Sequence, residues 1–172
     1  MMLTVISCRK IPRETIYSSY QFLVGTYTQN EQQGVNWIEY NPNTQQFQVK
    51  EVILGLQNPS FIKYNPTANH LFVSEEIGGE NGGKINSFGL DIKNQNFKKL
   101  SVAFTQGDHP CVISFSPDKK WLIAGNYSGG NIAIFKIQKM MQPVVPKTIA
   151  EAIPAAVPLQ RHSLQSQVVW GQ

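Results

Sequence analysis

The sequence contains little charge, little cysteine and no long apolar run. Charged residues make up 15% of its 172 residues and hydrophobic residues 41%, a mixture that excludes an intrinsically disordered chain. The two cysteines, Cys8 and Cys111, lie far apart and provide neither a disulfide framework nor a cysteine-based metal site. No apolar run approaches the roughly 18 residues of a membrane-spanning helix. We therefore expect a cytoplasmic protein without membrane contact, metal or cofactor.

The net charge of +4 is not concentrated in the body of the chain. Between residues 21 and 137, nine lysines balance nine aspartates and glutamates, so the excess lies toward the two ends. A protein that binds nucleic acid through its phosphates needs clustered basic side chains on one face. The charge distribution therefore predicts no nucleic-acid partner.

One pattern recurs with a spacing of about fifty residues, which is typical of a repeat architecture. Each copy has two apolar residues, a small apolar residue, a small residue and then two polar or aromatic residues. The copies occupy residues 22–27, 71–76 and 122–127. Three further kinds of segment keep their order around these copies, at residues 35–40, 85–90 and 132–137, at 58–66 and 109–117, and at 47–53 and 97–104.

These segments have the features of β-strands rather than helices. They are short, rich in Val, Ile, Phe and Tyr, and bounded by Gly, Pro, Asn and Asp. Four antiparallel strands that recur at this spacing describe a propeller blade, whereas the main alternative, a β-sandwich, needs no such repeat. We predict an all-β propeller of four-stranded antiparallel blades, with about two and a half blades and about ten strands in this chain.

Several segments resemble one family in the same order. Residues 23–28 are similar to the opening strand of the lactonase family of seven-bladed β-propellers, the 6-phosphogluconolactonase-like proteins. Residues 58–61 (Asn-Pro-Ser-Phe) resemble the family's start of an inner strand. The motif of the next blade follows at Pro110–Cys111, residues 115–118 and residues 125–132.

This resemblance implies a sugar-lactone hydrolase that converts 6-phosphogluconolactone to 6-phosphogluconate in the pentose phosphate pathway. Its partner would be a small-molecule sugar lactone. A lactone-forming enzyme of the muconate cyclase type from the same family is an alternative that the sequence does not separate. Another alternative is a non-catalytic propeller fragment that serves as an interaction module and self-associates through an uncovered blade.

The ends of the chain differ from its body. We expect residues 1–20 to be an extension outside the family, residues 21–137 to form the blades, and residues 138–172 to be an irregular tail rich in Pro, Ala and Gln. One or two helical turns are predicted from Thr148 to Ile153, and the start of another strand at residues 167–170. Because a closed propeller needs at least four blades, we expect a truncated ring.

Polar residues gather where the first and second strands of each blade meet at one edge. Lactone hydrolysis needs a water activated by a base and donors for the developing oxyanion. We predict Glu75 and His109 as catalytic residues, and Val112, where the family often has histidine, indicates reduced activity. The predicted substrate-binding residues are Asn58, Glu76, Asn126, Tyr127 and Arg161. A glutamate or asparagine after a strand is more often a turn residue, which is the alternative for each of them.

Overall fold

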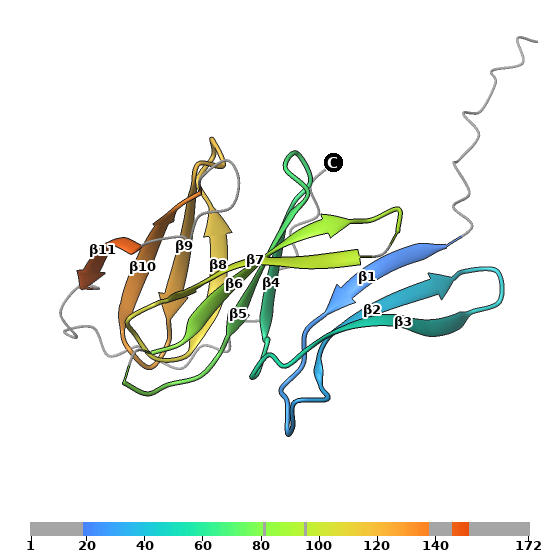
Figure 1. Cartoon of the computed structure of the whole chain (residues 1–172), viewed down its shortest axis with the longest axis horizontal. Helices are drawn as coiled ribbons and strands as arrows, with labels where there is room; N and C mark the ends of the chain where they lie inside the picture. The colour runs from blue at the N-terminus through green and yellow to red at the C-terminus, as the bar shows by residue number, and fades with distance from the viewer. Residues whose placement is uncertain (1–18, 81, 95, 138–145, 152–172) are drawn as a thin grey trace, which may run out of the picture.

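The computed structural model describes residues 19–80, 82–94, 96–137 and 146–151. Within these ranges all of the regular secondary structure is β-strand, and eleven strands form three antiparallel sheets. Figure 1 shows the sheets side by side in chain order, with the green middle sheet between the blue first sheet and the orange third sheet. No helix among the described residues is long and apolar enough to span a bilayer.

Each sheet is built from strands that are consecutive in the chain. The first sheet contains β1 (Tyr20–Val24), β2 (Gly34–Asn41) and β3 (Gln46–Leu54). The second contains β4 (Phe61–Asn65), β5 (His70–Glu75), β6 (Lys84–Asp91) and β7 (Asn96–Phe104). The third contains β8 (Pro110–Phe115), β9 (Trp121–Asn126), β10 (Asn131–Lys136) and β11 (Pro146–Glu151).

The repeat predicted from the sequence is confirmed by these sheets. The three copies of the main pattern lie on β1, β5 and β9, and each is followed by a strand that pairs with it. A β-bulge recurs at the same place in each sheet, where β2 pairs with β3, β6 with β7 and β10 with β11. The bulges lie at Trp37/Ile38, Ser87/Phe88 and Ile134/Phe135. Because a bulge bends and twists a strand locally, its recurrence gives the three blades the same curvature.

The first sheet differs from the others at its inner edge. β5 is flanked by β4, and β9 by β8, whereas their equivalent β1 pairs only with β2 among the described residues. The first sheet therefore corresponds to the outer three strands of a blade. The other two sheets are complete four-stranded blades.

The segment at residues 146–151 corrects one expectation. An irregular tail with a helical turn from Thr148 was predicted there, but the structure has the strand β11, which pairs antiparallel with β10. Proline is tolerated as the first residue of an edge strand because its missing N–H can face away from the sheet, and Pro146 has this position. The strand predicted at residues 167–170 lies outside the described residues, as do residues 1–18.

The second sheet is buried on both faces. Leu71 and Val73 of β5 pack against the first sheet, and Phe72 between them packs against the third. Successive side chains of a strand point to opposite faces, so a continuous apolar run is what a sheet between two others requires. In β9, by contrast, burial alternates, with Leu122 and Ala124 buried.

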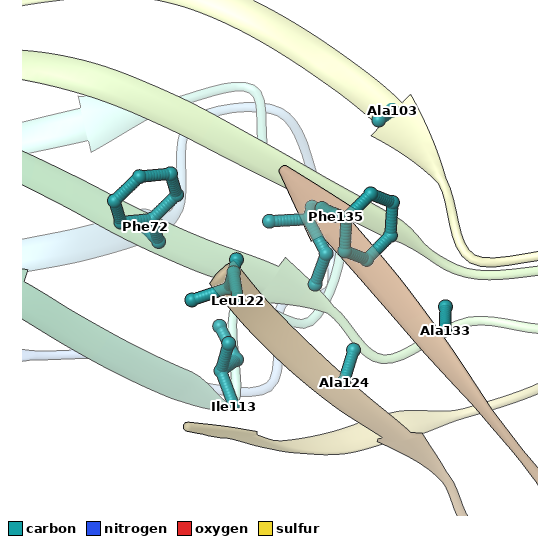
Figure 2. Packing of buried hydrophobic residues seen from close by; sticks show 8 residues of the cluster. Phe72, Ala103, Ile113, Leu122, Ala124, Ala133 and Phe135 are labelled. Carbon is teal, nitrogen blue, oxygen red and sulfur yellow. The ribbon is translucent and has the colours of Figure 1, made fainter. Parts of the chain in front are cut away.

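Two apolar clusters join the three sheets. The cluster between the second and third sheets centres on Phe72 and Phe135, which are 1% and 0% exposed, and Figure 2 shows the small side chains of Ala124 and Ala133 beside them. The aromatic ring of Phe72 also meets that of Phe115 edge to face at 5.7 Å. Small and large side chains thus interdigitate across this seam.

Apolar side chains also cover the face of the first sheet that points away from the second. Because Leu23 and Trp37 face the second sheet, their neighbours on β1 and the matching residues of β3 point to the opposite side. They are between 39% and 68% exposed, and they are Tyr20, Phe22, Val24, Phe47 and Val49. We call this set the outer apolar face.

Candidate active site

The residues before the inner strands and after the second strands come together at one rim, as the sequence predicts. Asn58 and His109 occupy equivalent places there, and both have a left-handed backbone, with φ of 46° and 56°. The carbonyl of Asn58 accepts the N–H of Glu76 at 3.0 Å, and that of His109 accepts the N–H of Tyr127 at 2.9 Å. The structure therefore brings four of the predicted site residues to one rim, whereas their chemical roles stay predictions.

Three polar side chains, one from each of the three sheets, gather at this rim. The hydroxyl of Tyr27, after β1, lies close to the carboxylate of Glu76, after β5, and Cys111 at the start of β8 lies close to the same carboxylate. The hydrogen bond to Glu76, together with partial burial, raises the pKa of Tyr27. Burial, and then the charge of Glu76, raises the pKa of the Cys111 thiol. This rim cluster of Tyr27, Glu76 and Cys111 combines a carboxylate with two neutral donors.

Glu75 does not share this environment, because successive residues of a strand point to opposite faces. Its side chain lies in the groove between the first and second sheets, which has a volume of about 780 Å³. There its Oε1 accepts a hydrogen bond from Asn86 Nδ2 at 2.7 Å, and its Oε2 lies 3.5 Å from Lys84 Nζ. Glu75 is 4% exposed, and its contacts are those of a residue that holds β5 to β6. Its predicted catalytic role stays a prediction.

Asn126 is the third-sheet counterpart of Glu75 and is also buried. Its Nδ2 donates to Asn131 Oδ1 at 2.8 Å and to the carbonyl of Thr105 at 3.3 Å. These contacts close the junction between the second and third sheets. The neighbouring Tyr127, in contrast, is 79% exposed at the rim, where a ligand can reach it.

His109 has one ring nitrogen, Nδ1, that is buried and has no hydrogen-bond partner among the described residues. A Cβ atom added to Gly78 would lie 3.2 Å from His109 Cε1, which places the imidazole against the chain after β5. His109 thus stays a candidate for proton transfer, whereas Arg161 lies outside the described residues.

Sequence reasoning placed Tyr27 at this rim without giving it a role, and it did not select Cys111 or Asn86 for the site. The repeat contained the signal for the first two, because Tyr27 is the counterpart of Glu76 and Cys111 that of Ser60. Asn86 was detectable only from the strand register, in which it lies beyond Lys84 on the same face of β6. Among the described residues, no three His, Cys, Asp or Glu side chains gather closely enough to hold a metal ion.

Comparisons with known proteins agree with this architecture. A family model described as "Lactonase, 7-bladed beta-propeller" matches residues 21–162. The 6-phosphogluconolactonase of Bacillus subtilis (strain 168) is 22% identical over 122 residues, which cover 71% of this chain and 34% of that protein. The 6-phosphogluconolactonase of Formosa agariphila is 23% identical over 117 residues, with 67% and 33% covered.

The solved structures give the same picture. The periplasmic gluconolactonase PpgL of Pseudomonas aeruginosa matches with a TM-score of 0.67 and 28% identity, and the match covers 77% of this chain and 39% of that one. The chain spans about a third of the length of the curated relatives that it matches. Since the family model covers most of the described residues and the three sheets follow one another as blades, the chain belongs to the lactonase family of seven-bladed β-propellers.

Proposed function

We propose that this chain carries part of the active site of a sugar-lactone hydrolase whose substrate is 6-phosphogluconolactone and whose product is 6-phosphogluconate. Two relatives are named 6-phosphogluconolactonase, and a structural neighbour is named gluconolactonase. The observation that carries the proposal is the rim cluster, in which the Glu76 carboxylate lies beside the Tyr27 hydroxyl at a seam between two blades.

The rim cluster suits the chemistry of lactone hydrolysis. A carboxylate such as Glu76 can accept a proton from the attacking water as the new C–O bond forms at the lactone carbonyl. A neutral hydroxyl such as that of Tyr27 can donate to the developing oxyanion once it turns from Glu76 to the substrate. The ring C–O bond then breaks, and the leaving alkoxide takes up the proton. We assign the base to Glu76 rather than Glu75, because the two carboxylate oxygens of Glu75 already have protein partners.

The remaining predicted residues take supporting roles in this proposal. His109, with its unpaired ring nitrogen, is the second candidate for proton transfer. Tyr127 offers an exposed hydroxyl to the sugar, and Arg161 is the proposed ligand of the phosphate. Lys84 is less suited to the phosphate because it is paired with Glu75.

The test is the rate of 6-phosphogluconolactone hydrolysis by the full chain, measured against the spontaneous rate. We expect an acceleration that Glu76→Gln reduces by about 100-fold or more, since this is the usual contribution of a general base. Glu80→Gln, a change at an exposed loop residue on the same side of the second sheet, is the matched control and should keep the activity. An unaccelerated reaction would remove the proposal for this chain.

A second candidate function is supported by the outer apolar face. Contiguous apolar surface of this kind marks an interaction site or an association liability, and it favours an interaction module that self-associates. Light scattering across a dilution series separates the two functions. A monomer at every concentration, with little binding of an apolar dye, would argue against the module.

Two finer assignments belong to the same proposal. A lactone-forming reaction of the muconate cyclase type would use the same rim with a different substrate, so assaying lactone formation from muconates distinguishes it. We also propose a cytoplasmic location and a role in the pentose phosphate pathway; the names of the relatives give no compartment, and one structural neighbour is named periplasmic. Cell fractionation tests the location.

A further inference from the structure

Besides the groove that contains Glu75, a second cavity lies between the first and second sheets, with a volume of about 350 Å³. This size is toward the lower end of the range for small-molecule sites. The cavity is bounded by the start of β5 and the end of β4, whereas the rim lies at the end of β5 and the start of β4. We call it the seam pocket. Its walls include Leu23, Trp37, Ile62, Tyr64, Leu71 and Leu90.

The repeat explains why this seam has room for a pocket. Leu23 in the first sheet occupies the place that Phe72 has in the second. Between the second and third sheets, the ring of Phe72 takes that place and meets the ring of Phe115 edge to face at 5.7 Å. Tyr64 is the counterpart of Phe115, so the first seam keeps the aromatic wall but has a leucine instead of the second ring. The repeat therefore does not impose the pocket on every seam.

The indole of Trp37 is the polar group of interest in the seam pocket. Trp37 is 3% exposed, and its Nε1 has no hydrogen-bond partner among the described residues. Its counterpart Ser87 is paired with Ser101 at 2.6 Å, and its counterpart Ile134 has no polar group. A buried donor without an acceptor is costly, and native structures pair nearly all of them. Because Trp37 lines the pocket, a molecule bound there can supply the acceptor.

We propose that the seam pocket binds a small apolar molecule with one hydrogen-bond acceptor, a class that includes aryl ketones and aldehydes, and that this acceptor bonds to Trp37 Nε1. The hydroxyl of Tyr64 is already used, since it donates to Asn69 Oδ1 at 2.8 Å. Ile92 at the edge of the pocket is 43% exposed, so the pocket reaches the surface.

This site is separate from the proposed active site. None of the described residues that line the pocket carries a charge, so a phosphorylated sugar acid has no charged partner there. The pocket also lies at the opposite end of the sheets from the rim. The proposal therefore does not rest on the proposed function.

The experiment uses acetophenone as the probe and α-methylstyrene as its control, because the two have nearly the same shape but the control has a CH₂ group in place of the carbonyl oxygen. Each is titrated into the ¹⁵N-labelled full chain, and the indole N–H signals are followed by NMR. Trp37→Phe identifies the signal of Trp37. Acetophenone should move this signal downfield and saturate it, whereas α-methylstyrene should not produce the downfield shift. The indole signal of Trp121 in β9 should not respond to either probe.

Two variants test the two halves of the proposal by ligand-observed NMR. Trp37→Phe keeps an aromatic ring but removes the N–H, so it should weaken the binding of acetophenone relative to α-methylstyrene about fivefold, the usual contribution of one hydrogen bond. Leu23→Phe places a ring where the second sheet has Phe72 and should abolish the binding of both probes. Leu54→Phe is its matched control, since Leu54 is 55% exposed and lies outside the pocket.

Acetophenone that causes no saturable shift of the Trp37 indole would overturn the proposal, as would equal shifts with both probes. Unchanged binding in a folded Leu23→Phe chain would place the probes elsewhere and overturn it too. If Leu23→Phe does not fold, Trp37→Phe decides, because an unchanged relative affinity there excludes the hydrogen bond. A chain that binds acetophenone as expected but hydrolyses no lactone would refute the proposed function and leave the seam pocket in place.

Discussion

The carboxylate of Glu75 and the amide of Asn86 meet at 2.7 Å in the interior between the first and second sheets. The two side chains are 4% and 0% exposed, so the bond is closed off from water. Removal of one partner leaves the other as a buried polar group without its bond, which costs about 1–3 kcal/mol. We expect Glu75→Ala to lower the free energy of unfolding by this amount, measured by denaturation in urea.

Glu75→Gln serves as the comparison, because the glutamine oxygen can still accept the hydrogen bond from Asn86 while the ion pair with Lys84 is lost. Lys84 is 30% exposed, and partly exposed ion pairs contribute little to stability. Glu75→Gln should therefore lower the free energy of unfolding clearly less than Glu75→Ala does. Equal losses in both variants would show that the charge, rather than the hydrogen bond, is what matters.

The seam between the second and third sheets should depend strongly on Phe135. Its ring is fully buried in the cluster shown in Figure 2, and truncation of a buried phenylalanine costs about 3–5 kcal/mol. Phe135→Ala should lower the free energy of unfolding by about this amount. Phe47→Ala is the matched control, since Phe47 is 68% exposed on the outer apolar face and should change the stability little. Similar losses in both would contradict this account of the core.

Gly25, just after β1, lies close to the backbone of Pro59, which precedes β4 of the second sheet. A Cβ atom at this position would overlap the backbone carbonyl oxygen of Pro59, which cannot move aside as a flexible side chain would. We expect Gly25→Ala to destabilise the chain by at least about 1–3 kcal/mol, the usual cost of overpacking. Thermal unfolding measures this loss.

The control for this change is Gly89→Ala in β6. A Cβ atom there would meet only Leu100, at an ordinary distance of 3.8 Å. Alanine at such a position is neutral or slightly stabilising, because it restricts the unfolded chain. If Gly89→Ala destabilised as much as Gly25→Ala, the cause would be the loss of glycine itself and not the close approach.

Cys111 should react slowly with alkylating reagents near neutral pH. Burial, and then the charge of Glu76, raises the pKa of this thiol above its usual value of 9.0, so less of the reactive thiolate is present. We expect its alkylation by iodoacetamide at pH 8, measured in a Cys8→Ser background, to be slower than that of the unfolded chain. Glu76→Gln should accelerate it.

The sign of the pH dependence follows from the same shift. Because the pKa of the Cys111 thiol is higher in the folded chain than in the unfolded one, the thiol favours the folded state below pH 9. This contribution disappears as the pH rises through the folded pKa. Above pH 9, the free energy of unfolding should therefore fall more for the unaltered chain than for Cys111→Ser. An equal fall in both would contradict the shift.

The architecture was accessible from the sequence because each blade must present the same apolar pattern to its neighbours. The run Leu71-Phe72-Val73 already carried the signal of a strand buried on two faces, whereas the more mixed pattern around Phe22 belongs to a sheet with one open face. The strand β11 was missed because prolines are frequent around it. An edge strand tolerates them, and composition does not show which strand will be at the edge.

The site was accessible only in part. The repeat showed that Asn58, Glu76, His109 and Tyr127 end at one rim, since this follows from strand order. Which of the neighbouring Glu75 and Glu76 faces the rim depends on where β5 ends relative to β4. The side-chain partners of Asn58 depend on the backbone angle at a single residue, and a periodic pattern carries no information about either.

The alternation along β5 also bears on how the chain finds its fold. Leu71 and Val73 belong to one seam and Phe72 to the other, so a slip of β5 by a single residue would exchange the contents of both seams at once. A mispaired β5 would therefore be destabilised at both seams, by steric overlap at one and by a cavity at the other. The middle blade thereby acts as a register check for the blades on either side of it.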